Sequence, residues 1–194
     1  MQAIKIGLLG LGTVGSGTAE VLQKNAAEIS RRLGREVRLA MVSSRDAAKA
    51  RSVCPDAQYV ADPFELVRHP DVDIVVELFG GTQIAKELVL EAVENGKHVV
   101  TANKKLLAEY GNEIFALAGR KNVMVQFEAA VAGGIPIIKA LREGMSANRI
   151  KSIMGIINGT SNFILSEMRE KGSPFAQVLK QAQELGYAEA DPTF

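Results

Sequence analysis

The residues best suited to chemistry in this sequence are three glycines near its beginning, Gly10, Gly12 and Gly15, spaced G-x-G-x-x-G. They follow an apolar stretch, Ile4–Leu9, which reads as a buried strand, and a helical pattern begins directly after them. In such a unit the first glycine permits the turn, the second lets the backbone approach a phosphate, and the third lets the helix pack closely. The helix N-terminus then faces the anion. The pattern predicts a dinucleotide pyrophosphate site, with a structural glycine turn as the alternative.

The end of the next expected strand bears on which dinucleotide would bind. NAD-binding folds carry Asp or Glu there, which holds the ribose 2′-hydroxyl. Here the strand at 37–42 is followed by Ser43, Ser44 and Arg45, and Glu36 lies at the opposite end of the strand. Arg45 could pair with a 2′-phosphate through its planar guanidinium, with the serines as smaller donors. Because no carboxylate is expected at this position, the residues favour NADP(H), with NAD(H) also possible; a solvated loop arginine is the alternative.

Two further loops are expected at the carboxyl ends of strands, where ligands bind in open α/β sheets. The first, LFGGT at 78–82, is glycine-rich, which fits either close backbone approach to a ligand or a simple turn. The second, TANKK at 101–105, places Lys104 at the start of a helix. A cation at the positive end of the helix dipole is unfavourable, so Lys104 is a candidate for a functional role.

Composition and charge exclude several classes of function. The chain has 194 residues with a net charge of +1, which gives no electrostatic footprint for nucleic acid. A single cysteine, Cys54, excludes a disulfide framework, and the two histidines, His69 and His98, are expected to be structural. No apolar stretch approaches the roughly 20 residues needed to span a bilayer, and no secretory signal follows Met1. We expect a cytoplasmic protein without a membrane or nucleic-acid partner.

Strands and helices alternate along the first two thirds of the chain. A Val/Ile-rich run such as 73–78 is typical of a parallel strand that is covered on both faces. This order predicts an α/β fold with a Rossmann-type, doubly wound, mostly parallel sheet. The expected strands are Ile4–Leu9, 37–42, 58–61, 73–78, His98–Thr101 and 123–127. The expected helices are 14–33, Ala47–Val53, one beginning after Asp62, 83–95 and 105–118.

The pattern changes near residue 135. We expect a dinucleotide-binding domain over 1–135, and over 136–194 part of a second, α+β domain that serves substrate binding and dimerisation. The expected elements of this second region are a helix at 137–143, a strand at 149–157, a helix ending at Lys171 and a helix from Ser173 to about Leu185. The apolar strand would leave an open edge, which favours a homo-oligomer.

Six segments of the chain together resemble the homoserine dehydrogenase family. They follow the order and spacing of the family across the whole chain, and VTANK, EAAVAGGIP and NGTSNFIL are specific in combination. The segments are GLLGLGTVG, ELFGG, VVTANKKLLA, FEAAVAGGIPII, INGTSNFIL and GYAEADPTF.

The resemblance implies an oxidoreductase that moves hydride reversibly between NAD(P)H and L-aspartate 4-semialdehyde, giving L-homoserine on the way to threonine, methionine and isoleucine. It also implies a homo-oligomer, a dimer or tetramer. By resemblance, Lys104 lies near the cofactor and substrate, Gly186 contacts the cofactor, and Glu189 binds the amino group of homoserine. The pyrophosphate would be held by the glycine-loop residues Gly10, Leu11, Gly12, Thr13, Val14 and Gly15.

The family also implies a sodium ion. The side chain of Glu128 and the backbone carbonyls of Val131, Gly133 and Ile135 match its ligands, and oxygen donors suit such a hard cation. The general-acid lysine of the family is expected beyond Phe194. The 194-residue chain itself is therefore expected to bind NADP(H) with little or no turnover.

Two alternatives stay open at the level of the sequence. One is another NAD(P)-dependent amino-acid or semialdehyde oxidoreductase, which would lack EAAVAGGIP followed by NGTSNF. The other is a non-enzymatic nucleotide-binding redox sensor, which would need neither the lysine of TANK nor the GYAEADP segment.

Overall fold

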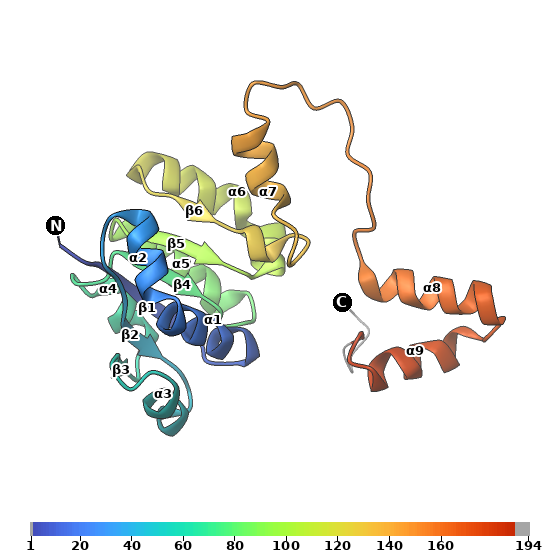
Figure 1. Cartoon of the computed structure of the whole chain (residues 1–194), viewed down its shortest axis with the longest axis horizontal. Helices are drawn as coiled ribbons and strands as arrows, with labels where there is room; N and C mark the ends of the chain where they lie inside the picture. Colours follow the sequence, from blue (N-terminus) through green and yellow to red (C-terminus); the bar gives the residue numbers. More distant parts are fainter. Residues whose placement is uncertain (1, 189–194) are drawn as a thin grey trace. The chain divides into compact units, whose positions relative to one another are not determined.

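The computed structural model describes residues 2–188. The chain forms two compact units, Met1–Ser146 and Ala147–Phe194 (Figure 1). Among the described residues, no helix combines the length and the apolar character that crossing a membrane requires.

The first unit is built on a six-stranded sheet in the order β3-β2-β1-β4-β5-β6, with every neighbouring pair parallel (Figure 1). This confirms the predicted α/β, Rossmann-type fold. The strand order reverses between β1 and β4, so a crevice opens at the carboxyl ends of these strands. The strands are β1 (Ile4–Leu9), β2 (Val37–Ser43), β3 (Gln58–Val60), β4 (Ile74–Glu77), β5 (His98–Thr101) and β6 (Val125–Gln126).

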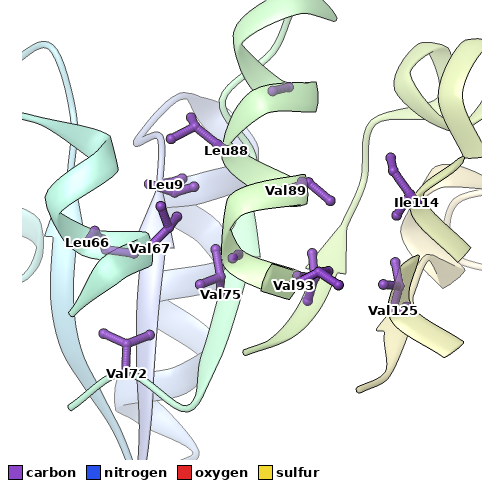
Figure 2. Packing of buried hydrophobic residues seen from close by; sticks show 14 of the residues in the cluster. Leu9, Leu66, Val67, Val72, Val75, Leu88, Val89, Val93, Ile114 and Val125 are labelled. Atoms are coloured by element: carbon purple, nitrogen blue, oxygen red, sulfur yellow. The ribbon is translucent and has the colours of Figure 1, made fainter. Parts of the chain in front are cut away.

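Helices cover both faces of the sheet, because successive side chains of each strand point to opposite faces. Ile6 and Leu8 of β1 are buried in one apolar cluster with residues of α1, α2 and α3. Leu9 is buried in the other cluster, with α4, α5 and α6 (Figure 2). The helices are α1 (Thr13–Lys24), α2 (Ala26–Leu33), α3 (Ala47–Val53), α4 (Pro63–Arg68), α5 (Gln83–Glu94) and α6 (Lys104–Lys121).

Short polar side chains cap the starts of α3, α4 and α6. The carboxylate of Asp62 accepts from the N–H of Phe64 (2.9 Å) and Pro63 opens α4, which confirms the predicted start. The single helix predicted over 14–33 was wrong in one respect, because α1 and α2 meet at Asn25. Asn is a weak helix former, and its backbone there (φ −104°, ψ 13°) leaves helical geometry.

The two histidines and the cysteine have structural surroundings. Nδ1 of His98 accepts from the N–H of Met124 (3.0 Å), and Nδ1 of His69 accepts from the N–H of Asp71 (3.2 Å). Cys54 is free and buried, and burial raises the pKa of its thiol, which makes it a poor nucleophile.

After β6 the first unit ends in short turns of helix, η1 (Glu128–Ala130), α7 (Ile137–Lys139) and η2 (Ala140–Gly144). The last two form the helix predicted at 137–143. The second unit contains α8 (Gly159–Lys171) and α9 (Phe175–Glu184), which pack through Ile164, Val178 and Ala182.

The strand predicted at 149–157 was wrong. This segment has no regular secondary structure, and its side chains are exposed. The isoleucine-rich sequence fits a strand, but a strand persists only when its N–H and C=O groups pair with a neighbour. Within residues 2–188 no strand pairs with this segment.

Candidate nucleotide-binding site

A cleft of about 620 Å³ lies at the carboxyl ends of β1, β2 and β4, where the strand order reverses. Its wall after β1 is Gly10, Leu11 and Gly12. Its wall after β4 is formed by the loop at 78–81, with Ile84 of α5. In parallel sheets of this order, dinucleotides bind at this crevice. The structure therefore brings the predicted glycine loop to the position where such a ligand would lie.

The three glycines are required for different reasons. A Cβ on Gly15 would lie 2.0 Å from the carbonyl oxygen of Gly10, so only glycine lets α1 approach the turn. Gly10 has φ +93°, and a Cβ there would lie 2.4 Å from the carbonyl oxygen of Leu78. A Cβ on Gly12 would meet no atom of the protein within 4 Å. The fold thus explains Gly10 and Gly15, whereas open space beside Gly12 suits a ligand that approaches its backbone.

The start of α1 is left open to an anion. Gly12 is its N-cap, no side chain caps that end, and its first turn carries no acidic residue. The starts of α3 and α6, in contrast, are capped by Asp46 and Asn103. Uncapped N–H groups and the positive end of the helix dipole are the features that bind phosphate. Thr13 and Val14, which open the helix, are both exposed.

The loop after β2 brings both signs of charge to the cleft. Ser44, Arg45, Asp46 and Lys49 line it, whereas Ser43 is buried at the end of β2. The prediction that no carboxylate stands here was therefore wrong. The carboxylate of Asp46 accepts from the backbone N–H of Lys49 (2.9 Å), so its main role in the fold is to cap α3.

Lys104, the candidate lysine of TANK, is the first residue of α6 and is exposed. Asn103 precedes it as the N-cap, with its side-chain oxygen 3.0 Å from the N–H of Leu106. The Nδ2 group of Asn103 donates to the carbonyl oxygen of Gly81 (2.6 Å), on the wall of the cleft. Asn103 thus ties the start of α6 to that wall, although Lys104 itself does not line the cleft.

Glu128, the candidate sodium ligand, is held in place by the backbone. Its two carboxylate oxygens accept from the N–H groups of Ile138 and Lys139, each at 2.8 Å. An ionised carboxylate retains further lone pairs after two such bonds. The side chain is therefore fixed and still able to coordinate a cation.

The loop that supplies the other candidate ligands bends sharply. Ala132 (φ +47°) and Gly134 (φ +84°) are both left-handed, which reorients successive carbonyl groups between Val131 and Ile135. The carbonyl oxygen of Ile135 accepts from the N–H of Ile137 (2.8 Å). No cluster of three His, Cys, Asp or Glu side chains occurs within residues 2–188, so a cation here would depend on one carboxylate and on carbonyls.

The remaining two candidates belong to the second unit. Gly186 follows α9 with φ +74°, a conformation that favours glycine. Beside it, the hydroxyl of Thr160 donates to the carbonyl oxygen of Tyr187. Glu189 lies outside the described residues.

Comparison with known proteins places the chain in one family over most of its length. The protein-family model described as "Homoserine dehydrogenase, NAD binding domain" matches residues 10–128 of the sequence. A second family model, described as "Homoserine dehydrogenase", matches residues 136–194. The chain belongs to the homoserine dehydrogenase family. It is 75% identical over its whole length to a homoserine dehydrogenase of Neisseria gonorrhoeae, and 60% identical to one of Pseudomonas aeruginosa. It spans 45% and 44% of these two relatives.

Solved structures of homoserine dehydrogenases have the same fold. One from Thiobacillus denitrificans matches the whole chain with 64% identity and a TM-score of 0.92, and the chain covers 45% of it. A hyperthermophilic archaeal homoserine dehydrogenase in complex with NADPH matches 99% of the chain with 30% identity and a TM-score of 0.82, and the chain covers 64% of it.

Several residues at or next to this cleft were not identified from the sequence. Asp46 caps α3 and Lys49 lies in its first turn, and an Asp directly before a helical pattern is a helix-start signal that could have located both. Glu77 is fully buried at the end of β4, where its carboxylate accepts from Thr101. The signal was present, because a carboxylate at the end of a Val/Ile run has no place in an apolar core without a partner. Asn103 could not be identified from local sequence, because its side chain donates to the carbonyl oxygen of Gly81, in a loop distant in sequence.

Proposed function

We propose that this chain is the nucleotide-binding part of a homoserine dehydrogenase, which reduces L-aspartate 4-semialdehyde to L-homoserine reversibly with NAD(P)H. The observation that carries the proposal is the cleft at the reversal of strand order, where Gly12 is open to a ligand and α1 begins uncapped. Gly10, Leu11, Gly12, Thr13, Val14 and Gly15 would form the pyrophosphate loop. The family match supports this assignment over another class of oxidoreductase.

NADP(H) is the proposed cofactor. Arg45 and Lys49 provide two cations and Ser44 a hydroxyl on the cleft wall where a 2′-phosphate would lie. Asp46 opposes this preference, but its carboxylate is already engaged with the start of α3. The archaeal relative in complex with NADPH supports the proposal. Comparing NADPH with NADH in one titration tests it, and tighter binding of NADH would contradict it.

A bound NAD(P)H would supply the hydride that the aldehyde carbon accepts in the proposed reaction. The aldehyde oxygen then develops negative charge, which a nearby cation stabilises and an acid protonates. Lys104 would supply the positive charge from the start of α6. The resemblance assigns the proton to a lysine beyond Phe194, so we propose that this chain alone binds the cofactor but turns over little or not at all.

A sodium ion is proposed at the end of the first unit. Glu128 would bind it through a carboxylate that Ile138 and Lys139 already orient, and carbonyls of Val131, Gly133 and Ile135 would complete the shell. The donor set fits a hard cation. Such an ion would fix the turn between β6 and α7.

The second region is proposed to serve substrate binding and assembly. We place the boundary between domains at residue 135, with the substrate and dimerisation domain beginning at 136. Gly186 would contact the cofactor, and Glu189 would bind the amino group of the substrate. A homo-oligomer and a role in threonine, methionine and isoleucine synthesis are part of the same proposal; the cytoplasmic location stays a prediction of the sequence.

A chimera tests the activity. The chain is extended with the part of the Neisseria gonorrhoeae relative that it does not span, and NADPH oxidation is followed with L-aspartate 4-semialdehyde. We expect turnover by the chimera and a rate at least about 10²-fold lower from the chain alone, which lacks the proton donor. NADPH binding without turnover in a folded chimera would instead indicate the non-enzymatic module.

Adjacent lysines provide a matched pair for the role of Lys104. Lys104→Ala in the chimera is expected to lower kcat/KM about 10²-fold, the usual cost of losing a charge that stabilises an oxyanion. Lys105→Ala removes the same charge one residue later, where the ammonium lies 4.0 Å from Glu109, and is expected to change kcat/KM less than about twofold. Equal effects of the two substitutions would contradict the assignment.

A further inference from the structure

In the wall of the cleft after β4, Leu78 and Phe79 pack against the apolar clusters, whereas the two glycines that follow have no side chain to pack. Gly80 and Gly81 are exposed, both have positive φ (+76° and +73°), and a Cβ on either would meet nothing within 4 Å. Two successive glycines give a chain many alternative conformations. Some other contact must therefore select the conformation that shapes the cleft.

The first contact comes from a buried carboxyl group beneath the loop. Glu77 is 0% exposed, and its Oε1 accepts from the N–H of Phe79 (2.9 Å). Its Oε2 accepts from the hydroxyl of Thr101 (2.6 Å), which is also fully buried at the end of β5. A carboxyl group in such a place is costly unless hydrogen bonded, so these two bonds fix its position.

The second contact spans the two loops. The hydroxyl oxygen of Thr101 accepts from the N–H of Asn103 (3.0 Å), which orients Asn103 at the start of α6. The side-chain oxygen of Asn103 caps the helix at Leu106, while its Nδ2 donates to the carbonyl oxygen of Gly81. Asp or Ser would cap the helix as well as Asn. Asp has no N–H donor, and Ser has one short hydroxyl, whereas the amide of Asn103 uses one atom for the cap and a separate N–H donor for the glycine loop.

We propose that Asn103, oriented by Glu77 through Thr101, is a positioning residue that holds the glycine loop after β4 against the start of α6. It fixes one wall of the nucleotide cleft and the adjacent lysine, Lys104, as a single unit. This inference rests on the proposed nucleotide site, because the purpose of the bridge is a cleft already shaped before the cofactor arrives. Preorganisation of this kind raises affinity by removing the ordering cost of binding.

Asn103→Ser separates the bridge from the cap. Serine is an equally good N-cap, but it is too short to reach the carbonyl oxygen of Gly81. We expect the chain to stay folded with only a small fall in the urea unfolding midpoint, while the Kd for NADPH, measured by nicotinamide fluorescence, rises about fivefold to tenfold, as expected for one lost hydrogen bond. Asp62→Ser, which exchanges one cap for another at α4 without such a bridge, is the matched control and should leave the Kd unchanged.

The link through Thr101 has its own pair of variants. Thr101→Val removes the hydroxyl that joins Glu77 to Asn103, and Thr101→Ser restores it. We expect the Kd to rise in Thr101→Val and to return close to the original value in Thr101→Ser. A rise of equal size in both variants would overturn the link.

Amide hydrogen exchange tests the bridge without any nucleotide. In Asn103→Ser, exchange over 79–82 should accelerate about fivefold to tenfold, while exchange within β4 stays unchanged. Unchanged exchange and unchanged Kd in this variant would overturn the inference. If the original chain fails to bind NADPH, the proposed function fails, and the exchange measurement still decides whether the bridge exists.

Discussion

The two units of this chain differ in how completely they satisfy their own apolar and polar groups. In the first, six parallel strands are covered on both faces, and the fully buried residues include Leu8, Leu9 and Val75. In the second, three residues form the buried cluster between α8 and α9. Before α8, apolar side chains lie in solvent, with Met154 93% and Ile157 99% exposed.

This difference shows which part of a fold is specified by the chain itself. In the first unit, the described residues pair the backbone groups of the strands with one another and bury their own apolar core. Its cleft therefore has a defined shape. The apolar residues at 149–157 are exposed to water, and burying them would be favourable. Residues 2–188 do not provide a surface that covers them. The chain spans slightly under half of the length of the relatives that it matches.

Hydrogen exchange should give the largest contrast between the regions. Amides at 150–157 have no ladder partner, and we expect them to exchange at nearly the rate of an unfolded peptide. Amides of β4, paired on both sides, should exchange more slowly by about 10³-fold or more. Protection of 150–157 in a monomeric sample would contradict the contrast.

Matched glycine substitutions test the contrast through stability. Gly15→Ala places a methyl group 2.0 Å from the carbonyl oxygen of Gly10, so we expect a loss of about 2–4 kcal/mol in the free energy of unfolding. Gly155→Ala, in the exposed segment, meets nothing within 4 Å and should change this free energy by less than about 0.5 kcal/mol. Urea unfolding followed by circular dichroism measures both, and similar losses would show that the segment is packed after all.

Gly12→Ala sharpens the distinction between fold and ligand within the first unit. Because its Cβ has open space, we expect the free energy of unfolding to change by less than about 1 kcal/mol. The methyl group would stand where the pyrophosphate approaches the backbone, so the Kd for NADPH should rise about tenfold or more, equivalent to about 1.4 kcal/mol. Calorimetry gives the Kd, and an unchanged value in a folded variant would argue against this binding mode.

The smallest expected effect concerns a buried lysine of the first unit. Lys97 is 8% exposed, and burial lowers the pKa of its ammonium group below the ordinary value of 10.5, an effect that the charges of Asp73 and Asp71 oppose. Lys97→Met should therefore stabilise the chain by about 0.5–1 kcal/mol at neutral pH.

The pH dependence of that gain follows from proton binding. Between the lowered pKa in the folded chain and 10.5, the unfolded chain binds more protons at Lys97, so the stability of the original protein rises with pH. The advantage of the methionine variant should then shrink as the pH approaches 10.5. Urea midpoints at pH 7 and pH 10 measure it, and an advantage that grew with pH would contradict the explanation.

The sequence predicted the fold well where local and long-range preferences agree. The glycine spacing after Ile4–Leu9, the Val/Ile runs and the Asp62-Pro63 start all describe elements that the sheet then uses. The strand predicted at 149–157 was wrong because apolar, β-branched residues favour an extended chain but supply no partner strand. A strand without a neighbour is not stable, and whether one exists depends on the rest of the molecule.

The site could be predicted only in part. Gly12 and Arg45 could be predicted, because the glycine spacing and the residue after a strand are signals that lie within a few residues of each other. The bridge from Asn103 to Gly81 could not be predicted. Its two ends are 22 positions apart, and their contact depends on the register of β4 and β5. Lys49 was partly predictable: the helix start was expected at Ala47, but that its first turn lines the cleft is seen only in the structure.

The central claim is that the cleft beside Gly12 holds a nicotinamide dinucleotide, and a titration of the isotope-labelled chain with NADPH, followed by amide chemical shifts, tests it most directly. We predict saturable shifts with one nucleotide per chain, concentrated at 10–15, 44–49 and 78–84, and their loss in Gly12→Ala. Saturable shifts confined to other residues, or none at all in a folded sample, would contradict the claim.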